Sequence, residues 1–203
     1  MTAAMETEKP KILVLFAHPY PHLSRVNRAM ADAVRDLPHV TFHDLYETYP
    51  DFFIHVKHEQ GLLLDHDVVV MQHPFYWYSC PSLLKEWMDA VLEYGWAYGT
   101  GGEALQGKEL AQAVSTGGPD EAYRAEGYNG ITMAELLRPF ERSAALCGMT
   151  YREPFLLQGA RLKKPDEVSA HAAAYRQWLI DYPHPKNCIG CEAPAVPASD
   201  RVG

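Results

Sequence analysis

The sequence of 203 residues lacks long apolar runs, an excess of positive charge and a rich complement of cysteines. No apolar stretch approaches the roughly 20 residues that a membrane-spanning helix needs. Residues 1–10 are polar and acidic, unlike a secretory signal peptide. The formal net charge of -8 argues against a surface that binds nucleic acid or anionic lipid, so local amides and hydrogen bonds would have to hold any phosphate. These absences predict a globular protein of the cytoplasm.

The four cysteines and ten histidines do not predict a disulfide framework or a metal site. Cys188-Ile189-Gly190-Cys191 is a C-x-x-C pair, but without a second pair it is at best half of a zinc site, and incidental thiols in a flexible tail are favoured. Cys80 is interpreted as a small apolar side chain rather than a redox sensor. Four histidines lack a helical ligand pair, and no metal is expected there: His18, His22, His55 and His58.

What the chain does have is a regular alternation of apolar and amphipathic segments. Apolar runs predict strands at 12–17, 40–45, 67–73, 109–115 and 149–158. Helical spacing predicts a first helix with an apolar face from Val26 to Leu37, for which Ser24 or Asn27 is available as the cap. It predicts further helices over 58–65, 81–92, 133–144 and 166–182. Pro139 inside the fourth pattern implies a kink or a later start.

Five strands that alternate with helices predict an α/β fold, with an open five-stranded parallel sheet and helices on both faces. We expect this domain to span residues 11–182, between a loose leader at 1–10 and a Pro/Ala-rich tail at 183–203. The aromatic segment 46–57 is expected to pack on a neighbour or to line a cleft.

Three unusual loops follow the first, third and fourth strands and start at His18, Pro74 and Thr116. The carboxyl ends of parallel strands share one edge of a sheet, so we expect the loops to meet there, where such folds bind ligands. The first loop lacks G-x-G-x-x-G and G-x-x-x-x-G-K-[ST], which disfavours a Rossmann dinucleotide site and a P-loop NTPase. Ser24, Asn27 and the amides of a helix N-terminus suit a single phosphomonoester instead.

The other two loops suit a flat ring. Residues 75–78 offer aromatic faces, and the small residues 115–118 let backbone amides reach a ring edge. A phosphate and a flat heterocycle at the switch point of a five-stranded sheet together describe FMN. Simpler interpretations stay open, with His18 closing a turn and Trp77 and Tyr78 serving as ordinary core or interface aromatics.

The sequence also resembles the NAD(P)H:quinone oxidoreductase family of flavodoxin-like flavoproteins. The motifs that carry the resemblance are Ala17-His18-Pro19, His73-Pro74-x-x-Trp77-Tyr78-Ser79-x-Pro81, Leu83-Leu84-Lys85-x-Trp87 and Thr116-Gly117-Gly118. Within that family, residues 45–52 and 95–99 look like the ancillary subunits of glutathione-regulated potassium efflux systems. The resemblance runs from about residue 11 to residue 182.

The resemblance implies a flavodoxin-like fold, FMN as cofactor, NAD(P)H as co-substrate and a quinone as acceptor, with hydride passing through the flavin in a ping-pong reaction. It also implies a homodimer in which the partner chain completes each flavin pocket. The FMN contacts that it implies are His18, Ser24, Arg25, Val26, Asn27, Phe75, Tyr76, Trp77, Tyr78, Ser115, Thr116, Gly117 and Gly118.

Three further residues are expected to manage charge on the reduced flavin. Better-known quinone reductases carry a Tyr and a His after Thr-Gly-Gly, and counting from the glycines places Tyr123 and Asn129 at these positions. Asn129 can donate a hydrogen bond but cannot take up a proton near pH 7, so the neighbouring Tyr128 is a candidate substitute. As surface loop tyrosines, Tyr123 and Tyr128 would have no such role.

Two other functions stay open beside the enzyme. In the first, the chain is a regulatory subunit that docks on the cytoplasmic domain of a potassium efflux transporter. That partner would then hold the chain peripherally at the inner membrane. Alternatively, it would carry electrons through FMN for other proteins and have no nicotinamide site.

Overall fold

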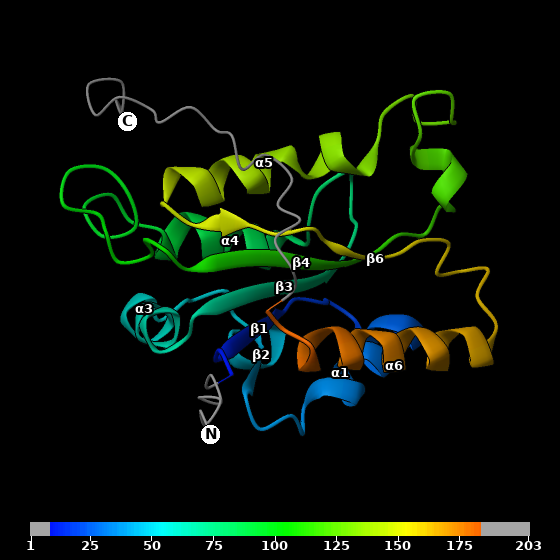
Figure 1. Ribbon diagram of the computed structural model, residues 1–203, viewed down its shortest axis with the longest axis horizontal. Helices are drawn as coiled ribbons and strands as arrows, with labels where there is room; N and C mark the ends of the chain where they lie inside the picture. Colours follow the sequence, from blue (N-terminus) through cyan, green and yellow to red (C-terminus); the bar gives the residue numbers. More distant parts are fainter. Residues whose placement is uncertain (1–8, 184–203) are drawn as a thin grey trace, which may run out of the picture.

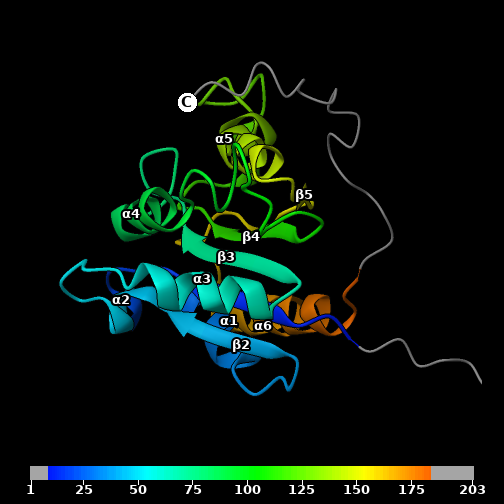
Figure 2. The same cartoon turned by 90° about the vertical axis from the view of Figure 1, so that its left-hand side faces the viewer.

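The computed structural model describes residues 9–183, so the C-x-x-C pair and nearly all of the predicted leader and tail lie outside the described residues. Its centre is a parallel sheet in the order β2-β1-β3-β4-β5, with β6 also paired to β4 (Figure 2). The strands are β1 (Ile12–Phe16), β2 (Val40–Asp44), β3 (Val68–Pro74), β4 (Glu109–Ser115), β5 (Thr150–Tyr151) and β6 (Phe155–Leu157).

Helices cover both faces of this sheet. The bounds are η1 (Pro21–Leu23), α1 (Arg25–Val34), α2 (Leu45–Thr48), α3 (Val56–Asp65), α4 (Ser82–Val91), η2 (Asp120–Tyr123), α5 (Met133–Leu146) and α6 (Pro165–Ile180). Figure 1 shows α1 and α6 on one side of the sheet and α4 and α5 on the other. Within residues 9–183, no helix is long and apolar enough to cross a membrane.

Strand β1 explains why the sheet must be covered twice. All five of its residues are buried. Leu13 and Leu15 belong to the core that includes α3, α4 and α5, whereas Ile12 and Val14 belong to the core that includes α1 and α6. A strand with two buried faces has no polar position, which produces the continuous apolar run in the sequence. The predicted doubly covered parallel sheet is confirmed.

The predicted fifth strand at 149–158 is wrong as a single strand. Leu110 pairs with Tyr151, but Ala113 pairs with Phe155, so two residues of β4 (111–112) face three residues of the edge chain (152–154). The extra residue is a bulge, and Pro154 within it has no N–H to donate to the ladder. The edge strand is therefore split into β5 and β6.

Helix boundaries differ from the prediction in smaller ways. Helix α5 begins at Met133 after a capping box of Thr132 and Glu135, so a later start is wrong, although Pro139 does lie inside the helix. Helix α3 begins two residues before His58, and Pro81 is the N-cap of α4 rather than its first residue. Helix α6 ends at Ile180 rather than at residue 182.

A buried carboxylate ties together the elements that follow β2. Glu59 in α3 is fully buried, and Tyr49 Oη donates a hydrogen bond to its Oε1 at 2.5 Å. Trp87 Nε1 in α4 donates to its Oε2 at 2.7 Å, and His43 Nε2 in β2 lies 2.9 Å from Oε1. The aromatic segment 46–57 is thus partly buried, as expected, whereas Phe53 is 72% exposed.

Candidate functional site

The loops that follow β1, β3 and β4 are joined to one another at the carboxyl edge of the sheet. Phe75 N donates to Ser115 O at 2.8 Å, and Asn27 Nδ2 donates to Ser115 Oγ at 2.8 Å. Residues 116–130 (green) and the loop between β6 and α6 (gold) both extend from the right-hand side of Figure 1. The structure therefore brings the three predicted loops together and adds a fourth.

His18 in the first loop is buried and closes a turn. Its Nδ1 accepts a hydrogen bond from Tyr20 N at 3.0 Å, so the neutral ring carries its hydrogen on Nε2. Burial, with a smaller effect of His22, lowers the pKa of His18 to about 4. The ring is therefore neutral at pH 7 and acts there as a hydrogen-bond donor rather than as a cation.

The start of α1 exposes backbone amides and one hydroxyl. Ser24 caps the helix, because its Oγ accepts from Asn27 N at 3.1 Å and from Asn27 Nδ2 at 3.2 Å. Val26 and Asn27 are 3% and 2% exposed, so their side chains face the interior. Of the predicted contacts at 24–27, Ser24 and Arg25 can present side chains to a surface ligand, and Val26 contributes its backbone. Asn27 offers a buried Oδ1 that has no hydrogen-bond donor among the described residues.

A hollow of about 340 Å³ lies in front of this helix terminus and is lined by residues 23–26, Ala160 and Arg161. Arg161, which the sequence analysis missed, follows β6 and forms no hydrogen bond or ion pair within residues 9–183. Arg25 donates to the carbonyl oxygen of Lys163 at 3.1 Å and likewise has no carboxylate partner in the described part of the chain. Two cations beside the positive end of a helix dipole make the hollow suitable for an anion.

Arg161 could have been found in the sequence. It lies in the basic run Arg161-Leu162-Lys163-Lys164, which follows the fifth predicted strand and therefore also belongs to the carboxyl edge.

The aromatic loop after β3 is a tight hairpin turn with a strained backbone. Ser79 N donates to Tyr76 O at 2.9 Å, and the two central residues have positive φ values, +51° at Trp77 and +61° at Tyr78. Such turns favour Gly, Asn or Asp, and a bulky residue in this conformation costs about 1–3 kcal/mol. Trp77 is 94% exposed, so it is not a core aromatic of this chain.

The loop after β4 offers backbone rather than side chains. Ser115 and Thr116 are buried, and Thr116 Oγ1 donates to Gly118 O at 2.7 Å. A side chain at position 118 would lie 3.3 Å from the ring and hydroxyl of Tyr123, whereas Gly117 is exposed. The absence of side chains at 117 and 118 leaves this backbone accessible to a ligand.

The structure brings two of the three predicted catalytic residues to the aromatic loop. Tyr123 packs edge-on against the ring of Phe75 at 5.9 Å, and Tyr78 Oη donates to Asn129 Oδ1 at 3.1 Å. Asn129 is held in turn by Ala122 O, which accepts from its backbone N at 3.0 Å and from its Nδ2 at 2.9 Å. Tyr128 is 93% exposed and is not brought to the other two.

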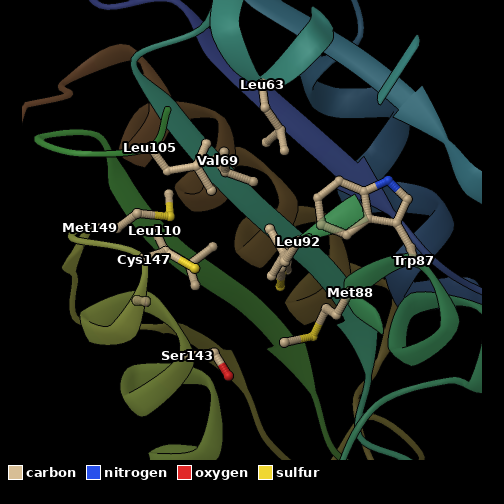
Figure 3. A pocket seen from close by; sticks show the side chains of 12 residues that line it. Leu63, Val69, Trp87, Met88, Leu92, Leu105, Leu110, Ser143, Cys147 and Met149 are labelled. Carbon is tan, nitrogen blue, oxygen red and sulfur yellow. The ribbon is translucent and has the colours of Figure 1, made fainter. Parts of the chain in front are cut away.

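An apolar void on the other side of the molecule does not belong to this site. It lies between β3 and helices α3, α4 and α5, and its lining includes Met88, Cys147 and Met149 (Figure 3). Its free volume of about 20 Å³ has room for roughly one water molecule. Burial raises the pKa of Cys147 to about 11, so this thiol stays protonated at pH 7. We interpret the void as a packing defect.

No group of three or more His, Cys, Asp or Glu side chains within residues 9–183 is arranged to hold a metal ion.

Comparison with known proteins gives three kinds of likeness. The family described by its flavodoxin-like fold matches residues 10–179. The glutathione-regulated potassium-efflux system ancillary protein KefG of Yersinia enterocolitica is 51% identical over 175 residues, which cover 86% of this chain and 95% of that protein.

Two solved structures are also similar. The general stress protein 14 of Treponema denticola, in complex with FMN, is 46% identical, with a TM-score of 0.80 over 84% of this chain and 98% of that one. An NADPH-quinone reductase from P. pentosaceus is 35% identical, with a TM-score of 0.76 over 83% and 97% of the two chains.

Proposed function

This chain belongs to the family of proteins with the flavodoxin-like fold, and on that premise we propose that it is an FMN-dependent NAD(P)H:quinone oxidoreductase. The observation that carries the proposal is the meeting of a hollow beside two arginines, a strained aromatic turn and a glycine pair at one sheet edge. The Treponema denticola relative has been solved in complex with FMN, and the P. pentosaceus relative is named an NADPH-quinone reductase, which supports the same assignment.

The residues at this edge fit the two ends of FMN. Arg25, Arg161 and the amides at the start of α1 would hold the phosphate, since they are cations and donors without carboxylate partners in the described chain. Asn27 Oδ1 is a buried acceptor without a donor among the described residues, and ribityl hydroxyl groups would satisfy it. Residues 75–78 and 117–118 would bound the ring.

When bound, FMN supplies the redox chemistry, because it can accept a hydride from NAD(P)H and pass two electrons to a quinone in a ping-pong reaction. The chain itself binds and orients. Neutral His18 offers an Nε2–H donor, and Tyr123 offers a hydroxyl beside the glycine pair. Asn129 does not titrate, and its amide is already engaged by Tyr78 and Ala122, so it cannot deliver a proton.

A second role is favoured by the likeness to KefG, which is named an ancillary protein of a potassium efflux system. We propose that this chain also docks on the cytoplasmic domain of such a transporter and is thereby held at the inner membrane. The proposal includes a homodimer, in which the partner chain would cover exposed aromatic side chains such as Trp77.

An anaerobic assay tests the proposed enzyme. The purified protein is expected to bind FMN, to lose its yellow colour when NADH or NADPH is added without oxygen, and to recover it with a quinone. A protein that takes up no FMN would leave the regulatory role alone. A protein that binds FMN but is not reduced by either nicotinamide would be an electron carrier instead.

A further inference from the structure

The hairpin turn at residues 76–79 holds two aromatic residues in a conformation that they rarely adopt. Trp77 and Tyr78 both have left-handed backbones, at φ +51° and +61°. A strained turn persists only where its surroundings fix it, and such turns cluster at ligand sites. Trp77 itself supplies no anchor, since its side chain is 94% exposed and forms no ring contact or hydrogen bond within residues 9–183.

Tyr78 is the anchored member of the pair. Its ring meets the ring of Phe75 edge-on, with 6.3 Å between centroids, and its hydroxyl donates to Asn129 Oδ1 at 3.1 Å. A flip of the Asn129 amide, which would exchange Oδ1 and Nδ2, would break a hydrogen bond, because Nδ2 donates to the carbonyl oxygen of Ala122 at 2.9 Å. Oδ1 is therefore fixed as the acceptor for Tyr78.

The hydrogen bond between Tyr78 and Asn129 joins two separate loops. One loop follows β3, and the other comprises residues 119–130 after β4. The backbone N–H of Asn129 also donates to Ala122 O at 3.0 Å. This bond closes the second loop internally, independently of the bond to Tyr78. The result is a clasp, which we define as Tyr78, Asn129 and Ala122.

We propose that Tyr78 and Asn129 are positioning residues that keep the aromatic turn in its ligand-ready conformation before a ligand arrives. The inference rests on the proposed FMN site and gives Asn129 a role other than proton delivery. A turn that is already fixed loses less conformational entropy on binding, so the hydrogen bond between Tyr78 and Asn129 raises affinity beyond any contact that the Tyr78 ring itself makes with the ligand.

The test uses Tyr78→Phe, Asn129→Ala and the double variant of the full chain. Each single change is expected to weaken FMN binding about 3- to 10-fold, the range for loss of one hydrogen bond. The double variant is expected to be no weaker than the weaker single variant, because both changes remove the same bond. Tyr94→Phe is the matched control, since it removes an exposed hydroxyl that donates to Thr100 Oγ1 at 3.2 Å in a different loop.

Hydrogen exchange of the protein without FMN provides a second measurement. Backbone amides at 122–129 are expected to exchange faster in Tyr78→Phe than in the wild type, with the thermal midpoint unchanged and the Tyr94→Phe control unaffected. Unchanged FMN affinity in the single variants, or effects that multiply in the double variant, would overturn the inference.

Failure of the proposed FMN-dependent function would give a different result from failure of this inference. If the wild type binds no FMN, the flavin assignment falls, and the exchange rates alone decide whether the clasp exists. Unchanged exchange in Tyr78→Phe would then reject it.

Discussion

Replacing Arg161 with alanine is expected to weaken binding of FMN while leaving binding of riboflavin unchanged. Arg161 lines the hollow in front of α1, and riboflavin differs from FMN in having no phosphate. The change should not disturb the fold, because Arg161 is exposed and forms no hydrogen bond or ion pair in the described chain.

The magnitude follows from the exposure of the guanidinium. A sheltered hydrogen bond between charged groups contributes roughly 1.5–3 kcal/mol, whereas exposed ion pairs contribute at most about 1 kcal/mol. The Arg161 side chain lies at an open hollow, so we expect a loss of about 1 kcal/mol, or about a 5-fold higher dissociation constant for FMN. Arg25 and the helix amides remain, so binding is weakened rather than abolished.

The assay is a fluorescence titration of the apoprotein with FMN and, separately, with riboflavin. Arg28→Ala is the matched control. Arg28 is an exposed arginine of α1, but it pairs with Asp32 and does not line the hollow. The affinity for FMN should also fall as salt is added, and this dependence should be shallower in Arg161→Ala. Equal losses for FMN and riboflavin, or no loss for either, would refute the assignment of the hollow to phosphate.

Three further predictions concern other parts of the chain. Gly117→Val is expected to weaken FMN binding at least about 10-fold with little change in stability, because the new Cβ would meet only Arg161 Nε at 3.6 Å; unchanged FMN content would reject the site. The His18 ring has a folded pKa of about 4, below the usual value near 6.5, so the unfolded state binds the extra proton and the free energy of unfolding falls as pH drops from about 6.5 to 4. Urea titrations of His18→Gln should show a shallower fall, by up to about 3 kcal/mol at pH 4, and parallel curves would contradict this. Glu59→Ala leaves the buried donors of Tyr49 and Trp87, and the partly buried His43, without their acceptor. It should cost about 3–5 kcal/mol in urea unfolding, and Glu59→Gln less; a cost under about 1 kcal/mol would disprove the network.

The central strands and the loops after them could be predicted because their signals are local. Strands β1 and β3 are buried on both faces. Most of their residues are therefore apolar, and the continuous apolar run can be recognised from the sequence alone. Ser24 could be proposed as a cap because Ser is a preferred residue just before a helix. The gathering of three loops then follows from the parallel order of the sheet.

The misses have a different origin. The bulge between β5 and β6 depends on register against β4, and a run of apolar residues does not reveal which of them pair. Arg161 lies in a basic run that is visible in the sequence, but its fourth loop carries none of the residue types expected around a flat ring. The strain at Trp77 and Tyr78 could not be read from the sequence, since neither residue signals a left-handed backbone.

Asn129 occupies the sequence position of a catalytic histidine in related enzymes but has a different role in this structure. Counting from the glycine pair aligns it with the histidine that manages charge on the reduced flavin in better-known quinone reductases, whereas the structure brings it to Tyr78. Its amide uses both a donor and an acceptor to hold two loops, so a residue that cannot titrate has become part of the scaffold. Under the proposed function, protons must therefore come from elsewhere. Because Trp77 and Tyr78 are 94% and 53% exposed, water can reach this edge of the single chain and supply them.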